Sequence, residues 1–335
     1  MARDKDFLTY NQQMRKLRND KHILCTGSNH KKILVRAGYF NIVNGYKNPF
    51  VSGQDSDGNH SYISGTSIDQ MQAVKKFDEQ LRSFLLRYIT QVEEEMRTLA
   101  GYKFDECNDN GTIPWYSTEA YSPINSLQDK MNVISSAYNE LSRSRLDYVN
   151  FYMKNHKQIP TWIMFKVVNF STFIDLIKYS KMDVSHSLCH LYNLYDDNGR
   201  PNVKLLIGSL HWMRKIRNAC AHNERVYCLT RKSDRNSTGR ILEQYFRTLG
   251  SGYARNLEQK LFDLFVYFKY YLPNNEYKQF INELKAMLNN LHEKIHPHAF
   301  EYIRGQMGIR HIEDLDVLLE LPKNDIEYNK FDKPI

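Results

Sequence analysis

Three features are missing from this sequence of 335 residues, and each absence excludes a class of protein. No run of about 18 apolar residues is present, so we expect no membrane-spanning helix. The first residues lack the apolar stretch of a secretory signal. The five cysteines are odd in number and form no C-x-x-C pair, which is typical of a reduced protein rather than of a disulfide framework. We therefore expect a cytoplasmic location.

The net charge of +8 is unevenly distributed along the chain. Residues 1–50 carry ten Lys or Arg against three Asp or Glu, and residues 200–255 carry twelve against three. The rest of the chain is net acidic. Two basic segments on an otherwise acidic protein favour a surface that binds a polyanion. The alternative is that the basic segments pair with the acidic remainder when the chain folds.

Apolar periodicity predicts a mainly α fold with a helical bundle at its core. Ser67 and Gln70 form a capping-box pattern at the start of a long helix. Apolar residues then recur at steps of three and four, so this helix is expected to end near Gly101. Further helices are expected at 9–19, 126–155, 160–180, 184–194, 202–224, 255–272 and 275–295, with a mobile basic loop at 229–254 and an apolar run in the tail that Pro322 stops.

The predicted elements divide the chain into three parts. Residues 1–65 form a mixed, mostly irregular segment rich in basic and aromatic residues, which we expect to contact RNA. Residues 66–295 form the helical bundle, and residues 296–335 form a helical C-terminal extension. No internal repeat is visible.

The stretch "WMRKIRNACAHNERVY" at 212–227 concentrates cations in one predicted helix. At 100° per residue, five hydrogen-bond donors fall within about 80° of its circumference, provided that the helix continues to residue 225. These donors are His211, Arg214, Asn218, His222 and Arg225, with Arg217 at the flank. The arc contains no acid, whereas a solvated face usually mixes Glu with Lys. Arg, His and Asn favour directional recognition of phosphate, and imidazole suits proton transfer near neutral pH. A solvated helix face remains the alternative.

The segment "RNACAHNERVY" resembles the HEPN ribonuclease motif and, more specifically, the signature of the Abi_2 abortive-infection family of AbiD- and AbiF-like proteins. The matching residues are Arg217, Asn218, Cys220, Ala221, His222, Arg225, Val226 and Tyr227. "AGYFNIVNGYKNPF", "FDEQLRSFLLRYITQVEEEMRT" and "IPTWIMFKVVNFSTF" resemble three other segments of that family in the same order. Lys166 and Ser171 depart from the family pattern, which has Glu and Gly there.

The resemblance implies a HEPN-type helical bundle, usually dimeric, and an anti-phage toxin that cuts RNA without a metal or cofactor. His222 would be the acid and base, Arg217 would hold and neutralise the phosphate, and Asn218 would orient His222 or the scissile phosphate. Arg214, Arg225 and His211 would extend the phosphate track. Arg217 and His222 are five positions apart, about 140° around a helix. A homodimer that faces two such helices would bring both pairs to one cleft.

The N-terminal segment "HKKILVRAGYF", with Tyr46 beyond it, mixes cations with aromatic rings. Lys31, Lys32 and Arg36 would contact RNA phosphates, and Tyr39 and Tyr46 would stack on bases. The alternative is a packed aromatic arm. The resemblance also leaves a second function open, namely an RNA-binding module with little catalysis that holds a structured non-coding RNA. Modification of tRNA or nucleotides is a weaker third possibility, because no glycine-rich nucleotide loop is present.

Two histidine pairs have the i,i+4 spacing of zinc ligands: His292 with His296, and His186 with His190. Neither pair has an evident acidic or cysteine partner at a fixed spacing, so helix-end or surface histidines are the simpler interpretation. We expect no metal site. Glu93, in "VEEEMR", either orients an arginine of the 217–222 motif or forms a structural ion pair.

Overall fold

The computed structural model describes residues 7–54, 56, 58–232 and 258–331. The predicted mainly α class is confirmed. Strands occur among these residues only as two antiparallel two-stranded pairs. Most of the basic loop expected at 229–254 lies outside the described residues. None of the described helices combines the length and the apolar character that crossing a bilayer requires.

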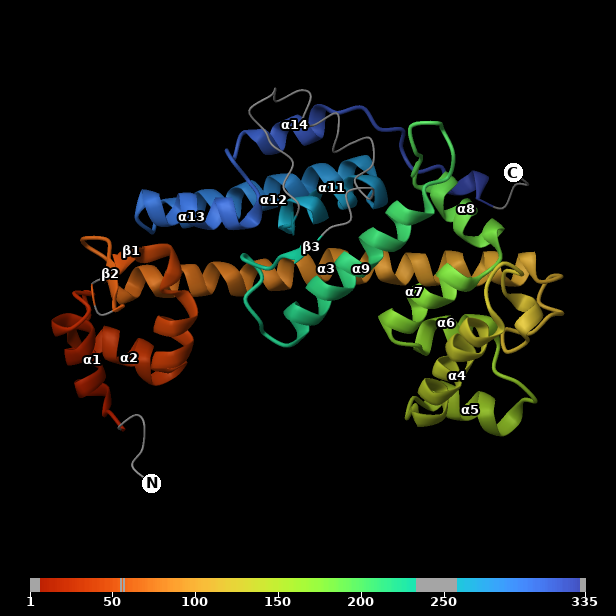
Figure 1. Cartoon of the computed structure of the whole chain (residues 1–335), viewed down its shortest axis with the longest axis horizontal. Helices are drawn as coiled ribbons and strands as arrows, with labels where there is room; N and C mark the ends of the chain where they lie inside the picture. Colours follow the sequence, from red (N-terminus) through yellow and green to blue (C-terminus); the bar gives the residue numbers. More distant parts are fainter. Residues whose placement is uncertain (1–6, 55, 57, 233–257, 332–335) are drawn as a thin grey trace.

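One long helix, α3 (Ile68–Cys107), runs through the length of the molecule (Figure 1). Ser67 caps its start by accepting a hydrogen bond from the backbone amide of Gln70, as predicted. The predicted end near Gly101 is wrong, because Gly101 is buried inside the helix against the ring of Phe165. Tertiary packing of this kind outweighs the low helix propensity of glycine, which costs about 1 kcal/mol.

The N-terminal elements gather at one end of α3 (Figure 1). They hold more regular structure than the sequence predicts, although a helix near 9–19 was expected and is confirmed. Thr9 and Gln12 close a capping box there. The elements are α1 (Tyr10–Asn19), α2 (Gly27–Ala37), the π-helix η1 (Phe40–Asn44), the 3-10 helix η2 (Asn48–Phe50) and the hairpin β1 (Val51–Gln54) with β2 (His60–Tyr62).

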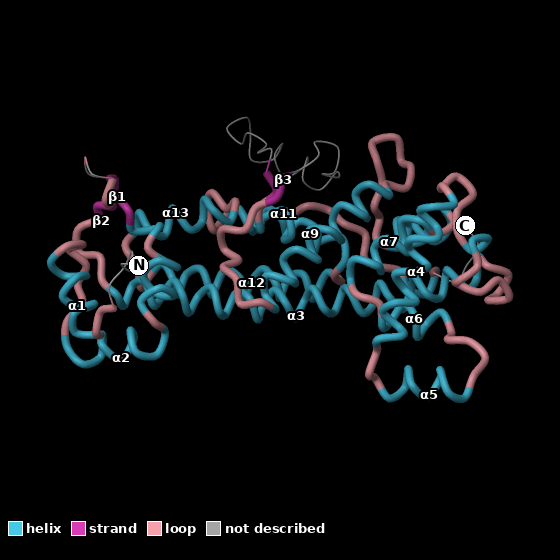
Figure 2. The backbone as a smooth tube through the Cα atoms, turned by 60° about the horizontal axis from the view of Figure 1, so that its bottom comes forward, coloured by secondary structure: helices cyan, strands magenta, loops and turns pink. Residues whose placement is uncertain are grey.

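A group of shorter helices packs at the other end of α3 (Figures 1 and 2). The helices predicted at 126–155 and 160–180 each divide in two. Asn169 explains the second division, because its side chain accepts from the amides of Ser171 and Thr172 and so begins a new helix. The group consists of α4 (Leu127–Arg143), α5 (Asp147–Asn155), α6 (Thr161–Val167), α7 (Phe170–Tyr179) and α8 (Met182–Leu191).

The C-terminal helices lie along one side of α3 and reach back toward the N-terminal elements (Figure 1). Pro273 separates α11 from α12, as the sequence predicts. A helical extension was expected at 296–335, and its first helix begins at Pro297. The elements are α11 (Leu261–Tyr271), α12 (Asn274–His292), α13 (Pro297–Met307), α14 (Asp314–Glu320) and the 3-10 helix η4 (Tyr328–Lys330), preceded by the short pair β3 (Arg231–Lys232) and β4 (Glu258–Gln259).

Candidate RNA-processing site at the end of helix α9

Helix α9 (Val203–Ala221) carries the stretch with the predicted donor face. It crosses the middle of α3 and also contacts α7, α8 and α11 (Figure 1). Asn202 caps its start by accepting from the amide of Leu205. The predicted apolar side is buried, with Met213 and Ile216 fully enclosed. Burial of this side fixes which residues α9 presents outward.

The expected continuation of this helix to residue 225 is wrong. Asn223 takes the left-handed conformation, with φ of 56°. The amide of Glu224 then donates to the carbonyl of Ala219 over 2.9 Å, which closes the helix in a Schellman motif. Asparagine is one of the few non-glycine residues that adopt this conformation readily. His222 therefore stands at the helix end, and Arg225 leaves the donor face.

The three predicted catalytic residues lie at this outer end of α9. Nη1 of Arg217 donates to Oδ1 of Asn218 over 3.2 Å. The Arg217 side chain is 39% exposed, and Asn218 and His222 are exposed. No hydrogen bond of the His222 imidazole is found among the described residues, whereas its backbone amide donates to the carbonyl of Asn218. The end of the helix thus offers a guanidinium, an amide and an imidazole to an incoming ligand.

Glu93 on α3 lies behind Arg217 and confirms the expected contact with an arginine of the motif. Its Oε1 accepts from Nη2 of Arg97 at 2.7 Å, and its Oε2 lies 3.7 Å from Nε of Arg217. Arg97 also donates to the carbonyls of Phe165 and Val168. Glu93 therefore forms a structural ion pair with Arg97 and also lies near Arg217, and its orienting role stays a prediction.

The departure from the family pattern at Ser171 has a consequence for Arg214. Nη1 of Arg214 donates to Oγ of Ser171, on α7, over 2.6 Å. A glycine here would offer no such acceptor, and the sequence analysis did not identify this contact. Burial, followed by the nearby charges of Arg214 and Arg231, lowers the pKa of His211 to about 4. His211 is therefore neutral near neutral pH and adds no charge to a phosphate track. The other departure, Lys166, places its Nζ 5.8 Å from the ring centre of Tyr148.

A buried carboxylate connects the chain beyond α9 to the N-terminal elements. Oδ1 of Asp78 accepts from the amides of Val226 and Tyr227 at 3.0 and 3.1 Å. Its Oδ2 accepts from the hydroxyl of Tyr46 at 3.0 Å and from Nη1 of Arg82 at 2.7 Å. Burial raises the pKa of Asp78, and its hydrogen bonds oppose that rise. Asp78 therefore holds Tyr46, Arg82 and the chain after α9 together, and we call this carboxylate with its four donors the Asp78 joint.

This joint corrects the expectation that Tyr46 stacks on RNA. Tyr46 is only 5% exposed, and its ring packs against that of Tyr227 with centroids 6.4 Å apart. Its hydroxyl donates to Asp78, so the side chain is held within the fold, although it also lines the cleft beside η1. Tyr39 is half-buried, and burial raises its pKa to about 12. The alternative of a packed aromatic arm is correct for Tyr46.

Arg225 and the cations of α2 lie in different settings. Nη1 of Arg225 donates to the carbonyl of Gly45 over 2.6 Å, which ties the chain after α9 to the turn after η1. Lys32 and Arg36 on α2 are exposed, and Lys31 is half-buried. The cleft that separates η1 from the chain after α9 is lined by Arg225 but by none of these three α2 residues.

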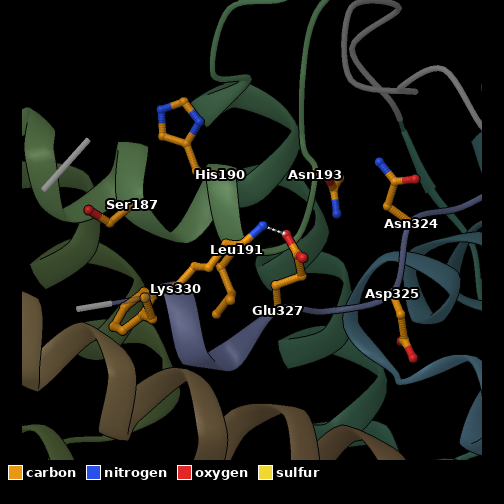
Figure 3. A pocket seen from close by; sticks show the side chains of 9 residues that line it. Ser187, His190, Leu191, Asn193, Asn324, Asp325, Glu327 and Lys330 are labelled. Atoms are coloured by element: carbon orange, nitrogen blue, oxygen red, sulfur yellow. Dashed lines mark hydrogen bonds and ion pairs between the residues drawn. The ribbon is translucent and has the colours of Figure 1, made fainter. Parts of the chain in front are cut away.

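Three of the four paired histidines contact other groups, namely His190, His292 and His296. The described residues contain no group of three potential metal ligands. His292 stacks on Phe300 with ring centroids 4.5 Å apart, and Nδ1 of His296 accepts from the amide of His298. His190 hydrogen-bonds Tyr195 through Nδ1 and also lines a pocket of about 540 Å³ beside the C-terminal segment (Figure 3). The labelled carboxylates and lysine of this pocket belong to the C-terminal segment, and none of its lining residues belongs to α9.

Comparison with known proteins identifies the family of the chain. No curated protein and no solved structure matches the chain. A family model described as Abi-like protein matches residues 32–228, which is more than half of the chain. This range runs from α2 through α9 and includes Asp78, Glu93, Arg217 and His222. The chain therefore belongs to the Abi-like protein family, and this membership indicates a role in abortive-infection defence against phage.

Proposed function

We propose that this protein is a metal-independent HEPN endoribonuclease that acts as a toxin in abortive infection. One observation carries the proposal: the exposed end of α9 presents Arg217, Asn218 and His222 together, with Glu93 behind Arg217. Each of the three supplies a function that RNA cleavage through the 2′-hydroxyl requires. The RNA class of substrate follows from the resemblance of the 217–222 segment to the HEPN motif.

The chemistry needs two proton transfers and one cation. The 2′-oxygen attacks the neighbouring phosphorus and loses its proton to a base. The bond from phosphorus to the 5′-oxygen breaks, and that oxygen takes up a proton from an acid. The products are a 2′,3′-cyclic phosphate and a 5′-hydroxyl. His222 carries the proton transfer, and Arg217 neutralises the charge that accumulates on the phosphorane oxygens.

Asn218 fits a positioning role beside these two residues. Its Oδ1 already accepts from Nη1 of Arg217, which limits the directions in which the guanidinium can point. Its Nδ2 is left to donate to a phosphate oxygen. Arg214, held by Ser171, continues the cationic surface toward α7. Arg225 fits the opposite margin, where Gly45 holds it.

A homodimer completes the proposed site. Each chain offers one His222, while the reaction has one proton to remove and another to deliver. A two-fold axis beside the end of α9 brings two histidines and two arginines to one cleft. One imidazole then serves as the base and its copy as the acid.

The test is cleavage of single-stranded RNA by purified wild-type, His222→Ala and Arg217→Ala proteins. We expect each variant to lose activity by at least about a hundredfold, because general acid–base catalysis and phosphate stabilisation each contribute at least that much. Both residues are at least partly exposed, so thermal melting should stay close to wild type. The wild-type product should end in a 2′,3′-cyclic phosphate, and EDTA should leave cleavage intact. Mixing the two inactive variants should restore little activity, because a mixed dimer holds one His222 and the proposed reaction uses two.

The same proteins separate catalysis from mere RNA binding. Lys215→Ala is a matched control, since Lys215 is an exposed cation of α9 that binds the carbonyl of Thr230 instead of joining the motif. It should cut RNA at the wild-type rate. Wild-type cleavage by the His222→Ala protein would refute the enzyme assignment. Tight binding of uncut RNA by the wild-type protein would favour the binding module that the resemblance also allows.

A further inference from the structure

A cleft of about 910 Å³ lies beside the end of α9, and the proposed chemistry leaves it without a role. One wall is η1, the π-helix that begins at Phe40. The other wall is the chain that follows α9, from Asn223 to Thr230. Residues of α3 that include Lys75 and Glu79 line it as well. Segments from three parts of the sequence thus enclose one space.

The wall formed by η1 is unusual in two ways. π-helices are rare and are found frequently at functional sites. Phe40 is 72% exposed, although phenylalanine is one of the residue types that proteins most often bury. Asn44 is also exposed, and no hydrogen bond of its side chain is found among the described residues. The wall therefore combines a free aromatic face with a free amide.

The two walls are fixed relative to one another. Arg225 donates to the carbonyl of Gly45 over 2.6 Å and so bridges them. Arg82, held by Asp78, donates to the carbonyl of Glu224 over 3.2 Å. These bonds join the chain after α9 to η1 and α3. The shape of the cleft is therefore set before any ligand binds.

The charges in the cleft favour a flat polar ligand over a bare phosphate. Lys75 is paired with Glu79 across one helical turn. Arg82 and Arg225 donate to carbonyls, and Glu224 adds a second carboxylate. A multiply charged anion would meet these acids as well as the cations. A nucleobase offers an aromatic face for Phe40 and an edge of donors and acceptors for amides and carboxylates.

The cleft also adjoins the proposed catalytic histidine. Asn223 lines it and directly follows His222, so their Cα atoms are about 3.8 Å apart. We propose that this cleft binds one unpaired nucleobase of the RNA, stacked on Phe40 with Asn44 at its edge, next to the phosphate that His222 processes. The identity of the ligand as RNA rests on the proposed function. The structure adds the location of the base and the residues that select it.

The test measures binding and cleavage separately. In a His222→Ala background, a fluorescent single-stranded RNA decamer should bind the Phe40→Ala variant about 5- to 150-fold more weakly, because one base–aromatic stack is lost. Phe40→Trp keeps an aromatic face and should retain the affinity. Phe151→Ala is the matched control, since Phe151 is 55% exposed and lies on α5, in the helix group at the far end of α3 (Figure 2). It should bind RNA as the parent protein does.

With His222 intact, a pool of random RNA substrates should show a base preference next to the cut. Phe40→Ala should flatten that preference and raise KM more than it lowers kcat. Equal RNA affinity of the Phe40→Ala and Phe151→Ala variants, or no RNA binding by the His222→Ala protein, would overturn the inference. A Phe40-dependent affinity in a protein that never cuts RNA would leave the base site standing and remove the enzyme. An active Phe40→Ala enzyme with an unchanged base preference would keep the enzyme assignment and remove the base site.

Discussion

Helix α3 carries two buried carboxylates, Asp78 and Glu93, each of which precedes an arginine partner by four residues. They lie fifteen residues apart, or about 22 Å along the helix. Asp78 accepts hydrogen bonds from four donors, two of them backbone amides of the chain after α9. Among the described residues only Arg97 donates a hydrogen bond to the Glu93 carboxylate, whose second oxygen faces Arg217 at 3.7 Å. The same i,i+4 pair of an acid and an arginine thus occurs in two arrangements. In the closed arrangement Asp78 accepts from four donors, and in the open arrangement one oxygen of Glu93 faces the partly exposed Arg217.

The difference shows how one helix supports both a joint and a site. The Asp78 carboxylate is enclosed, so its interactions serve to hold Tyr46, Val226 and Tyr227 in place. The partner of Glu93 at the motif is 39% exposed. Arg217 can therefore be oriented by Glu93 and still reach a ligand. Asp78 fixes the chain that follows His222, and we expect Glu93 to orient the guanidinium of Arg217.

The largest effect should follow from breaking the closed arrangement. Asp78→Ala leaves Arg82 without its carboxylate and two backbone amides without an acceptor. Removal of one partner of a buried ion pair costs about 3–5 kcal/mol, so the free energy of unfolding in urea should fall by this amount. Glu79→Ala is the control, because Glu79 forms a partly exposed pair with Lys75 that is worth about 1 kcal/mol or less. Equal losses in the two variants would show that Asp78 is not a joint.

The open arrangement should respond mainly in activity. Glu93→Gln weakens the contacts with Arg97 and Arg217, and the carbonyl partners of Arg97 limit the loss of stability to about 1–3 kcal/mol. The orientation of Arg217 is lost as well, which should lower kcat about tenfold and leave KM nearly unchanged, because the guanidinium acts on the phosphorane.

Glu94→Gln changes an exposed carboxylate one residue later and is the control for this experiment. It should keep both stability and kcat. Glu93→Asp tests orientation, since the shorter acid keeps the charge but withdraws it from Arg217, and it should restore stability more fully than kcat. If kcat of Glu93→Gln equalled that of the wild type, Glu93 would be a structural residue only.

Local pattern in the sequence predicts the parts of the site that depend on helix geometry. The apolar stripe from Val74 onward predicts α3, and the 100° rotation per residue predicts the buried side of α9. That projection is correct up to Ala221 and fails at Arg225, because Asn223 turns the chain out of the helix. A glycine there would have marked the end. Asparagine can also adopt the left-handed conformation, but in a sequence it marks the end of a helix less clearly than glycine does.

Contacts between distant segments explain what the sequence could not predict. Tyr46 stands among cations in the sequence, and nothing local shows that Asp78, thirty-two residues later, binds its hydroxyl. Ser171 departs from the family pattern, but its contact with Arg214 exists only because α7 packs on α9. Phe40 matches the family pattern, but the sequence assigned it no contact with RNA, although it follows Tyr39 directly. The two differ in exposure, and tertiary packing decides exposure.

The smallest effect should come from removing a single donor of the closed arrangement. Tyr46→Phe keeps the ring that packs against Tyr227 and deletes the hydroxyl that binds Asp78. Three donors remain on the carboxylate, so the free energy of unfolding should fall by about 1 kcal/mol. RNA affinity should not change, because the ring stays and only the hydroxyl that is bound to Asp78 is removed. If the variant kept wild-type stability and bound RNA more weakly, Tyr46 would belong to the RNA-binding surface. The bond of its hydroxyl with Asp78 would then contribute nothing to stability, and the contrast between Asp78 and Glu93 would be smaller.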